Sequence, residues 1–247
     1  MEKGFLRDAI DRLVELAAPT TKEWDGRMFS SKPLEEITVE EDGPSRLNVN
    51  TLDALAVMIR TEGVKQKGLP LYIRVVDEHN VLVFTTLHDG KGTSFLRQYF
   101  YKAECDVPRV IIGQEMSQQQ AIIQLQSVYD AVGDRDYLLE LISRMSVNEG
   151  VTSDDNGVTQ TITARQGAVL KENMTVKPIV VLRPYRTFLE VEQPASEFLL
   201  RVGKEGGISL HEADGGVWRL EAKRRIADWL GKELQEDVDE GKVIITI

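Results

Sequence analysis

The chain has 247 residues, of which 42% are hydrophobic, so one large domain or two small ones can form a sizeable core. A formal net charge of −10 argues against a broad phosphate-binding surface, because nucleic-acid-binding proteins usually present a basic face. The single cysteine, Cys105, excludes an internal disulfide and fits a reducing cytoplasm.

The apolar runs are too short for a membrane span, which needs roughly 20 residues. The longest of them, such as 179–182, contain only a few residues. The N-terminal residues also lack the uninterrupted apolar region of a signal peptide. We therefore expect a cytoplasmic protein that does not contact a membrane.

Two helices are predicted in the first quarter of the chain. Apolar residues at helical spacing predict an amphipathic helix over 4–18, ended by a proline. A second helix is expected to begin after a cap at Asn50 or Thr51. Its buried stripe is Leu52, Leu55, Ala56 and Ile59. Between the two helices, 29–33 and 34–39 suggest short strands.

A β-hairpin and two extended segments follow. Runs of β-branched and aromatic residues at 72–76 and 81–86 predict the hairpin. Segment 94–104 is expected to be strand or extended loop, with Phe95, Tyr99, Phe100 and Tyr101 as bulky anchors. Segment 110–112 is predicted to form a short apolar strand.

The longest helical signal lies in the middle of the chain. It begins near Ser117, which has Gln120 as a capping-box partner, and resumes over 136–145 after a break at Gly133 and Asp134. The face predicted to be buried in its first part is Ile122, Ile123, Leu125, Val128 and Tyr129.

The stretch 151–202 reads as strands joined by tight turns, and we expect the rest of the protein to pack on this sheet. An Asn–Gly pair at 156–157 is typical of a hairpin turn. The predicted strands are 158–165, 176–182, 187–191 and 198–202.

A short strand at 208–211, a helix over 222–234 and a final strand over 242–247 complete the chain. The final strand would leave an exposed edge unless it pairs. We expect it to add to the main sheet or to pair across a subunit boundary.

The elements together predict an α+β fold. Its mixed, mainly antiparallel sheet is expected to pack with a long central helical segment and with N- and C-terminal helices. We expect a single domain over 1–247, with a helix- and hairpin-rich half, 1–150, and a β-rich half, 151–247, as the alternative division.

The chain contains no G-x-x-x-x-G-K-[ST] phosphate loop, no G-x-G-x-x-G, no H-E-x-x-H, no Cys/His metal set and no G-x-S-x-G elbow. His79 and His88 flank one strand and could share a metal, but exposed turn residues are the favoured interpretation. The carboxylates between Glu35 and Asp42 lack metal-ligand spacing. Acidic neighbours are expected to raise the pKa of Cys105. We therefore predict no enzymatic activity, cofactor or metal.

An arginine-rich element is the best candidate for a ligand-binding surface. Its residues are Arg183, Tyr185, Arg186 and Phe188. Arginine can grip a phosphate or carboxylate, and an aromatic ring can stack on a base. The structural alternative, which we favour, is pairing of the arginines with Glu190, Glu192 or Glu197. The basic cluster 223–225 would extend the surface if the last helix packs nearby.

Three stretches of the chain resemble an uncharacterised family of phage and prophage proteins, the YfdQ-like domain of unknown function. They are DNGVTQTITARQGAVL, PIVVLRPYRTFLEVEQPASEFLLRV and HEADGGVWRLEAKRRIADWL. The resemblance covers mainly the C-terminal two-fifths of the chain. It implies a virus-encoded protein of the host cytoplasm and carries over no catalytic residues.

The first functional hypothesis is a non-enzymatic phage or prophage protein for binding or assembly, which associates with itself. The first alternative is a nucleic-acid-binding accessory protein of phage replication or recombination, although the acidity of the chain disfavours it. Affinity that falls steeply with salt would support that alternative. A shell-forming, capsid-type subunit is a further alternative, and an enzyme with a site assembled from distant residues is the last.

Overall fold

The computed structural model describes most of the chain from residue 45 onward and short parts before it. The described ranges are 12–13, 21–24, 27–30, 45–65, 69–89, 95–146, 151–155, 160–166, 169–203 and 206–247. Contacts divide the chain into two units, 1–43 and 44–247, and each is described by itself. The single domain over 1–247, with 1–150 and 151–247 as its alternative division, stays a prediction.

The first unit contains a two-stranded antiparallel ladder in its described part. Strand β1 (Thr21–Trp24) pairs with β2 (Arg27–Ser30), which overlaps one of the predicted strands. Of the helix predicted over 4–18, only two residues are described, and both are helical. The strand predicted over 34–39 and the acidic cluster beside it lie outside the described residues.

A five-stranded mixed sheet organises one part of the second unit. Its strands are β3 (Leu47–Val49), β4 (Leu71–Val75), β5 (Asn80–Thr85), β8 (Tyr99–Glu104) and β15 (Val243–Thr246), in the order β15-β4-β5-β8-β3. β4, β5 and β8 are antiparallel, whereas β15 runs parallel to β4 and β3 parallel to β8. The predicted hairpin is confirmed, and the final strand adds to this sheet. A small ladder of β6 (His88–Asp89) and β7 (Phe95–Leu96) precedes β8.

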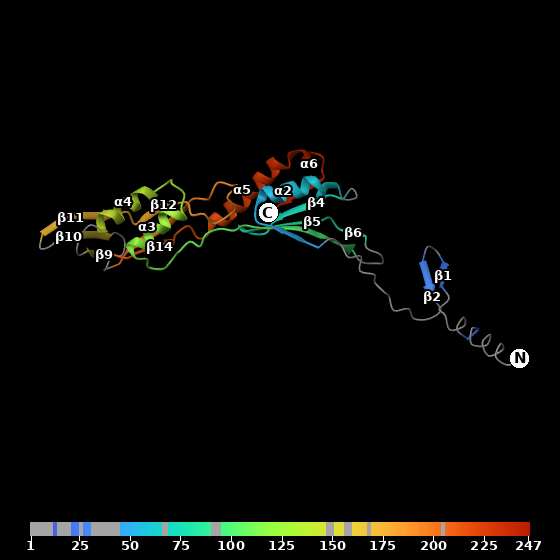
Figure 1. Ribbon diagram of the computed structural model, residues 1–247, viewed down its shortest axis with the longest axis horizontal. Helices are drawn as coiled ribbons and strands as arrows, with labels where there is room; N and C mark the ends of the chain where they lie inside the picture. Colours follow the sequence, from blue (N-terminus) through green and yellow to red (C-terminus); the bar gives the residue numbers. More distant parts are fainter. Residues whose placement is uncertain are drawn as a thin grey trace. The chain divides into compact units, whose positions relative to one another are not determined.

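Helices cover one face of the five-stranded sheet (Figure 1). They are α2 (Leu52–Thr61), α5 (Val217–Glu233) and α6 (Gln235–Asp239), and a 3-10 turn, η1 (Gly63–Lys65), follows α2. Thr51 caps α2 by accepting a hydrogen bond from Ala54 N, and the predicted buried stripe of α2 is confirmed. The core between helices and sheet includes Leu55, Ile59, Ile73, Val83, Ile226 and Leu230.

A second core lies between an antiparallel sheet and the two central helices. The sheet has the order β12-β13-β14, and its strands are β12 (Ile179–Leu182), β13 (Ser196–Val202) and β14 (Ile208–Glu212). The helices are α3 (Gln118–Ser127) and α4 (Arg135–Ser146). The capping box of Ser117 and Gln120 is confirmed, as is the break before α4. The core includes Leu125, Leu138, Ile142, Met145, Phe198 and Leu200.

A third antiparallel ladder has the order β11-β10-β9. Its strands are β9 (Val151–Asp155), β10 (Gln160–Gln166) and β11 (Val169–Val176). Strands β9 and β10 pair as the predicted hairpin, whose Asn–Gly turn lies outside the described residues. The Gln160 side chain joins this ladder to β13 by accepting from Val202 N at 3.0 Å.

The expectation that 151–202 forms one sheet beneath the rest of the protein is wrong. Its strands belong to two separate three-stranded sheets, and the five-stranded sheet is built from other parts of the chain. The segment predicted as one strand over 176–182 breaks after Val176, where Pro178 cannot donate to a ladder. β11 was not predicted before this break.

Three further predictions need correction. Residues 187–191 form a bend between β12 and β13, because a buried glutamine side chain binds their backbone groups, as described below. Residues 110–112 are extended without being a strand, and Ile111 N donates to the Gln124 side chain. On the face predicted to be buried at α3, Leu125, Val128 and Tyr129 are buried and Ile122 packs against the core, but Ile123 is 54% exposed and Ala121 is buried in addition.

The fold is α+β, with helices and a mixed sheet of mostly antiparallel strands, as predicted. None of the helices in the described ranges combines the length and the apolar character that crossing a bilayer requires.

Candidate functional site

The segment 183–195 joins the two cores of the second unit. It leaves β12 and returns to β13, both of which belong to the core with α3 and α4. Yet Phe188, with 0% exposure, and Val191 are buried in the core of the five-stranded sheet. The predicted ligand-binding element lies within this connection, so its residues take part in holding the two cores together.

Gln193 organises the backbone of this connection. Its Oε1 accepts hydrogen bonds from Arg186 N at 3.0 Å and from Thr187 N at 3.2 Å. Its Nε2 donates to the carbonyls of Thr187, Phe188 and Val191 at 3.4, 3.0 and 3.3 Å. One buried side chain therefore satisfies five backbone groups that a sheet ladder would otherwise have to satisfy.

Two more contacts fix the connection to the helix-covered sheet. The Glu190 carboxylate accepts from Leu52 N at 2.6 Å, at the N-terminus of α2, where the helix dipole favours a negative charge. Thr187 Oγ1 donates to the carbonyl of Glu78 at 2.6 Å, in the turn between β4 and β5. The segment is therefore bonded to both a helix and a hairpin.

Arg186 is the centre of a buried polar cluster. Its side chain is 6% exposed, and its Nη1 donates to Glu212 Oε1 at 2.7 Å. Its Nη2 donates to Ser196 Oγ, and its guanidinium lies 3.7 Å from the centroid of the Trp218 ring. Burial lowers the pKa of Arg186 to about 10, while Glu212 and Asp214 oppose that shift. The guanidinium therefore remains charged at neutral pH.

Neighbouring groups complete this cluster. Ser196 Oγ donates to Asp214 Oδ2 at 2.6 Å, and Trp218 Nε1 donates to Glu212 Oε1 at 3.0 Å. Burial raises the pKa of Asp214, but the hydrogen bonds from Ser196 and Gly216 outweigh it, so the net pKa is lowered. Burial raises the pKa of Tyr129 to about 12, which keeps its hydroxyl neutral beside the cluster. These contacts tie α5 and β14 to the 183–195 connection.

Arg183 and Tyr185 lie nearer the surface than Arg186. Arg183 Nη1 pairs with Glu192 at 2.5 Å, the pairing expected from the structural alternative. Arg225 of α5 also pairs with Glu192, at 3.2 Å, so the last helix packs beside this element. Arg186, in contrast, has Glu212 as its partner and none of the three expected glutamates.

Of the four residues predicted to bind a ligand, only Arg183 and Tyr185 are partly exposed, while Arg186 and Phe188 are buried. Ligand binding there stays a prediction, and a ligand could reach the buried pair only by displacing the connection. Sequence reasoning missed Gln193, Glu212 and Trp218. Glu212 and Trp218 reach Arg186 through the packing of β14 and α5, whereas Gln193 lies seven residues along the same connection and reaches it through the bend of the chain.

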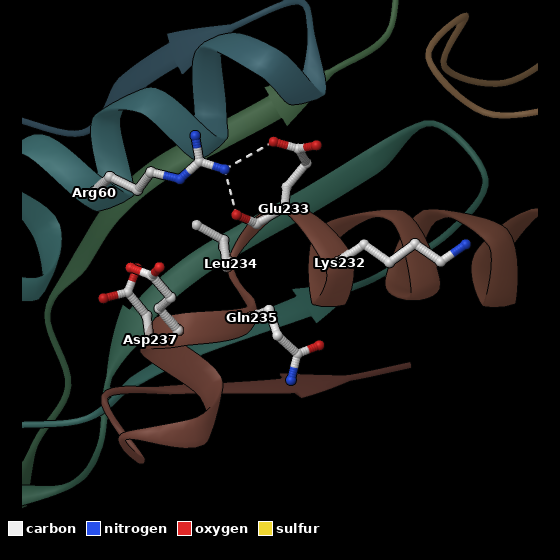
Figure 2. Close-up of a pocket in the computed structure, with 7 residues that line it drawn as sticks. Arg60, Lys232, Glu233, Leu234, Gln235 and Asp237 are labelled. Atoms are coloured by element: carbon white, nitrogen blue, oxygen red, sulfur yellow. Dashed lines mark hydrogen bonds and ion pairs between the residues drawn. The ribbon is translucent and has the colours of Figure 1, made fainter.

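A hollow of about 500 Å³ lies where α5 meets α6, beside α2 (Figure 2). Its charged lining residues are Arg60, Lys232, Glu233, Glu236 and Asp237. Figure 2 shows Arg60 reaching from α2 to Glu233, where Nη2 donates to Oε2 at 2.7 Å and also to the backbone carbonyl. A cation at the C-terminus of a helix is stabilising, so Arg60 holds α2 against α5.

At about pH 8, alkylation of Cys105 is expected to be at least about a hundredfold slower in the native protein than in the protein unfolded by urea. Burial, reinforced by the charges of Asp77, Glu104 and Glu190, raises the pKa of the thiol to about 12. Below that pH the thiol stays protonated, and only the thiolate reacts. Reaction with iodoacetamide, followed by mass spectrometry, measures both rates, and equal rates would contradict the prediction. The predicted direction of the shift is confirmed, with burial as its main cause.

The outer edge of β15 is open. Leu71 N donates to the carbonyl of Lys242, so alternation along the strand directs the backbone groups of Ile244 toward β4. The N–H and C=O groups of Val243 and Ile245 therefore point away from the sheet. Within the described ranges, no group bonds to them.

The edges of the other packed sheet are covered. Met116 and Ile208 exchange two backbone hydrogen bonds of 2.8 Å along β14. Along β12, Asp134 N donates to the Val181 carbonyl at 2.9 Å, and Val181 N donates to Asp134 Oδ2 at 2.9 Å. The outer edge of β15 is therefore more accessible for strand addition than β12 or β14.

No family model, curated protein or solved structure that we compared with the chain matches it. Among the residues that the structure describes, no three histidine, cysteine or carboxylate side chains gather as metal ligands.

Proposed function

We propose that the chain is a non-enzymatic binding or assembly protein, encoded by a phage or prophage, that associates with itself through β15 and works in the host cytoplasm. The resemblance of its C-terminal part to the YfdQ-like domain supports the phage origin. The open edge of β15 supports self-association and is the observation that carries the proposal.

The sequence of β15, Val-Ile-Ile-Thr, contains none of the features that usually protect a sheet edge. Such features are lysine, proline and a bulge, and no segment within the described ranges pairs with the outer side of the strand. Ile244 is 37% exposed beside this edge. An unprotected edge with apolar side chains favours the addition of another strand, in which main-chain hydrogen bonds supply affinity.

A second copy of the chain fits this edge. Two β15 strands can pair antiparallel about a twofold axis, so that Val243 and Ile245 of each copy exchange hydrogen bonds with the other. Such an interface is self-complementary and closes after two subunits. The two five-stranded sheets would then form one continuous sheet, which removes an exposed edge from both.

Replacing Ile245 with proline is expected to convert the dimer into a monomer of 27.8 kDa. The substitution removes an N–H that points outward and adds a ring that obstructs a partner strand, while the hydrogen bonds to β4 remain. Light scattering on a size-exclusion column measures the mass. A wild-type mass of one chain, or an Ile245→Pro mass equal to that of a wild-type dimer, would overturn self-association through β15.

Ile244→Pro is the matched control. Its N–H points toward β4, so the same substitution one residue earlier breaks an internal hydrogen bond and is expected to lower stability by about 3 kcal/mol. Urea unfolding of both variants shows whether the outward and inward positions differ. An assembly much larger than two chains would instead favour the shell-forming alternative.

A further inference from the structure

The face of the five-stranded sheet opposite the helices carries a row of aromatic side chains. Alternation places Ile73 and Val83 in the core and turns Tyr72 and Phe84 to the other face. In the register of the sheet, Ile244 lies beside Tyr72. Tyr72 lies beside Phe84, and Phe84 lies beside Tyr99. Helices α2, α5 and α6 all lie on the opposite side of the sheet (Figure 1).

The aromatic rings form a packed platform with an arginine on it. The ring centroids of Tyr72 and Phe84 are 5.7 Å apart, and those of Phe84 and Tyr99 are 5.3 Å apart. The Arg97 guanidinium lies 5.3 Å from the centroid of Phe84 and 5.9 Å from that of Tyr72. Phe84 is covered, with 7% exposure, whereas Tyr99 is 48% exposed and Arg97 is also exposed.

Two arginines that form no ion pair with any described residue accompany these rings. Arg74 is exposed on the same face, two residues along β4 from Tyr72. Within the described residues, neither Arg74 nor Arg97 forms an ion pair, whereas Lys102 on this face is neutralised by Glu104 at 2.5 Å. Arg74 and Arg97 therefore give the aromatic face a local positive charge, despite a chain charge of −10.

We infer that this face binds a single-stranded nucleic acid. Exposed aromatic rings and guanidinium planes stack on unpaired bases, and unpaired arginines attract the phosphates between them. Tyr99 and Arg97 provide the accessible stacking surfaces, and Arg74 and Arg97 provide the positive charge. A duplex hides the faces of its bases, so the platform suits a single strand.

The net negative charge of the chain does not prevent phosphate binding at this face. Phosphate binding depends on the charges near the strand, because salt screens those more than about 8–10 Å away. The inference does not depend on self-association or on Arg183 and Tyr185. It assigns the nucleic-acid-binding alternative to a different surface from the arginine-rich element.

Fluorescence anisotropy with a short labelled oligothymidylate tests the inference in the full-length protein. We expect wild-type binding that weakens as salt is added. Tyr99→Leu keeps the apolar contact with Phe84 but removes the ring, and is expected to weaken binding about tenfold. Arg97→Ala and Arg74→Ala are each expected to reduce the slope of log K against log salt by about 0.7, the value for one phosphate contact with a single strand.

Arg224→Ala is the matched control, because Arg224 is exposed on α5, on the helix-covered side of the sheet. It removes the same charge and is expected to leave affinity and slope unchanged. Absence of binding at low salt, unchanged binding by Tyr99→Leu, or an equal loss in Arg224→Ala would each overturn the inference. So would a loss of mass in Tyr99→Leu with no effect on the oligonucleotide, since the face would then contact a protein.

The two proposals fail separately. Ile245→Pro changes the edge of β15 and leaves Tyr99, Arg97 and Arg74 in place. We expect this variant to bind the oligonucleotide with the wild-type salt slope, even when its mass falls to that of one chain. A variant that keeps its mass but loses oligonucleotide binding, such as Tyr99→Leu, would leave the edge proposal unaffected.

Discussion

Replacing Arg186 with alanine is expected to lower the free energy of unfolding by about 3–5 kcal/mol. The substitution leaves Glu212 without its cation, removes the donor to Ser196 and removes the guanidinium that lies 3.7 Å from the centroid of the Trp218 ring. Removing one partner of a buried ion pair costs far more than removing one at the surface. Urea unfolding followed by tryptophan fluorescence measures the change.

Arg183→Ala is the control for this substitution. Arg183 is the other arginine of the element and pairs with Glu192 at a partly exposed position. Its loss is expected to cost less than about 1 kcal/mol. Equal losses of unfolding free energy in the two variants would show that Arg186 is not the structural centre described above. That result would favour ligand binding at this element.

Gln193→Ala is expected to have an effect of similar size, about 3–5 kcal/mol, because it leaves several buried backbone groups without partners. Arg186 N and Thr187 N lose their acceptor, and the carbonyls of Thr187 and Val191 lose this donor, whereas the Phe188 carbonyl still accepts from Val191 N at 3.4 Å. No other residue type combines an acceptor oxygen and a donor NH2 group on a side chain of this length. Gln193→Glu keeps the acceptor but cannot donate, so it is expected to be destabilising as well.

Gln235→Ala controls for the loss of a glutamine. Gln235 is exposed on α6 and donates to Asp239 at 2.8 Å. This substitution is expected to change stability by about 0.5 kcal/mol or less. If Gln193→Ala proved equally mild in urea unfolding, the connection between the two cores would not depend on that side chain.

Local signals in the sequence predicted several elements because local contacts determine them. The Ser117 capping box needs only a residue three positions away, and α2 needs only an N-cap and an apolar stripe. The β4–β5 hairpin likewise joins neighbouring strands. None of these elements depends on how distant segments meet.

The division into two cores could not be predicted from local patterns. Residues 187–191 have the composition of a strand, but Phe188 and Val191 enter the core of a sheet to which their neighbours β12 and β13 do not belong. Once the chain leaves β12 in this way, Gln193 replaces the missing ladder. A long-range contact thereby overrides local strand propensity.

The residues of the candidate surfaces also could not be predicted from local sequence patterns. The partner of Arg186 was expected among nearby glutamates, but β14 brings Glu212 to it, opposite Phe198 in the β13–β14 register. The aromatic row depends on the pairing of β4, β5 and β8, including an irregularity between Val83 and Phe84. Register across three strands sets these contacts, and spacing in the sequence does not reveal it.

Amide hydrogen exchange along β15, measured by NMR at low and at high protein concentration, tests self-association through this edge most directly. We predict that the amides of Ile244 and Thr246, which face β4, are protected at both concentrations. Those of Val243 and Ile245 should become protected only as the protein associates. Rapid exchange of Val243 and Ile245 in a sample that light scattering shows to be associated would contradict the proposal and place the interface elsewhere.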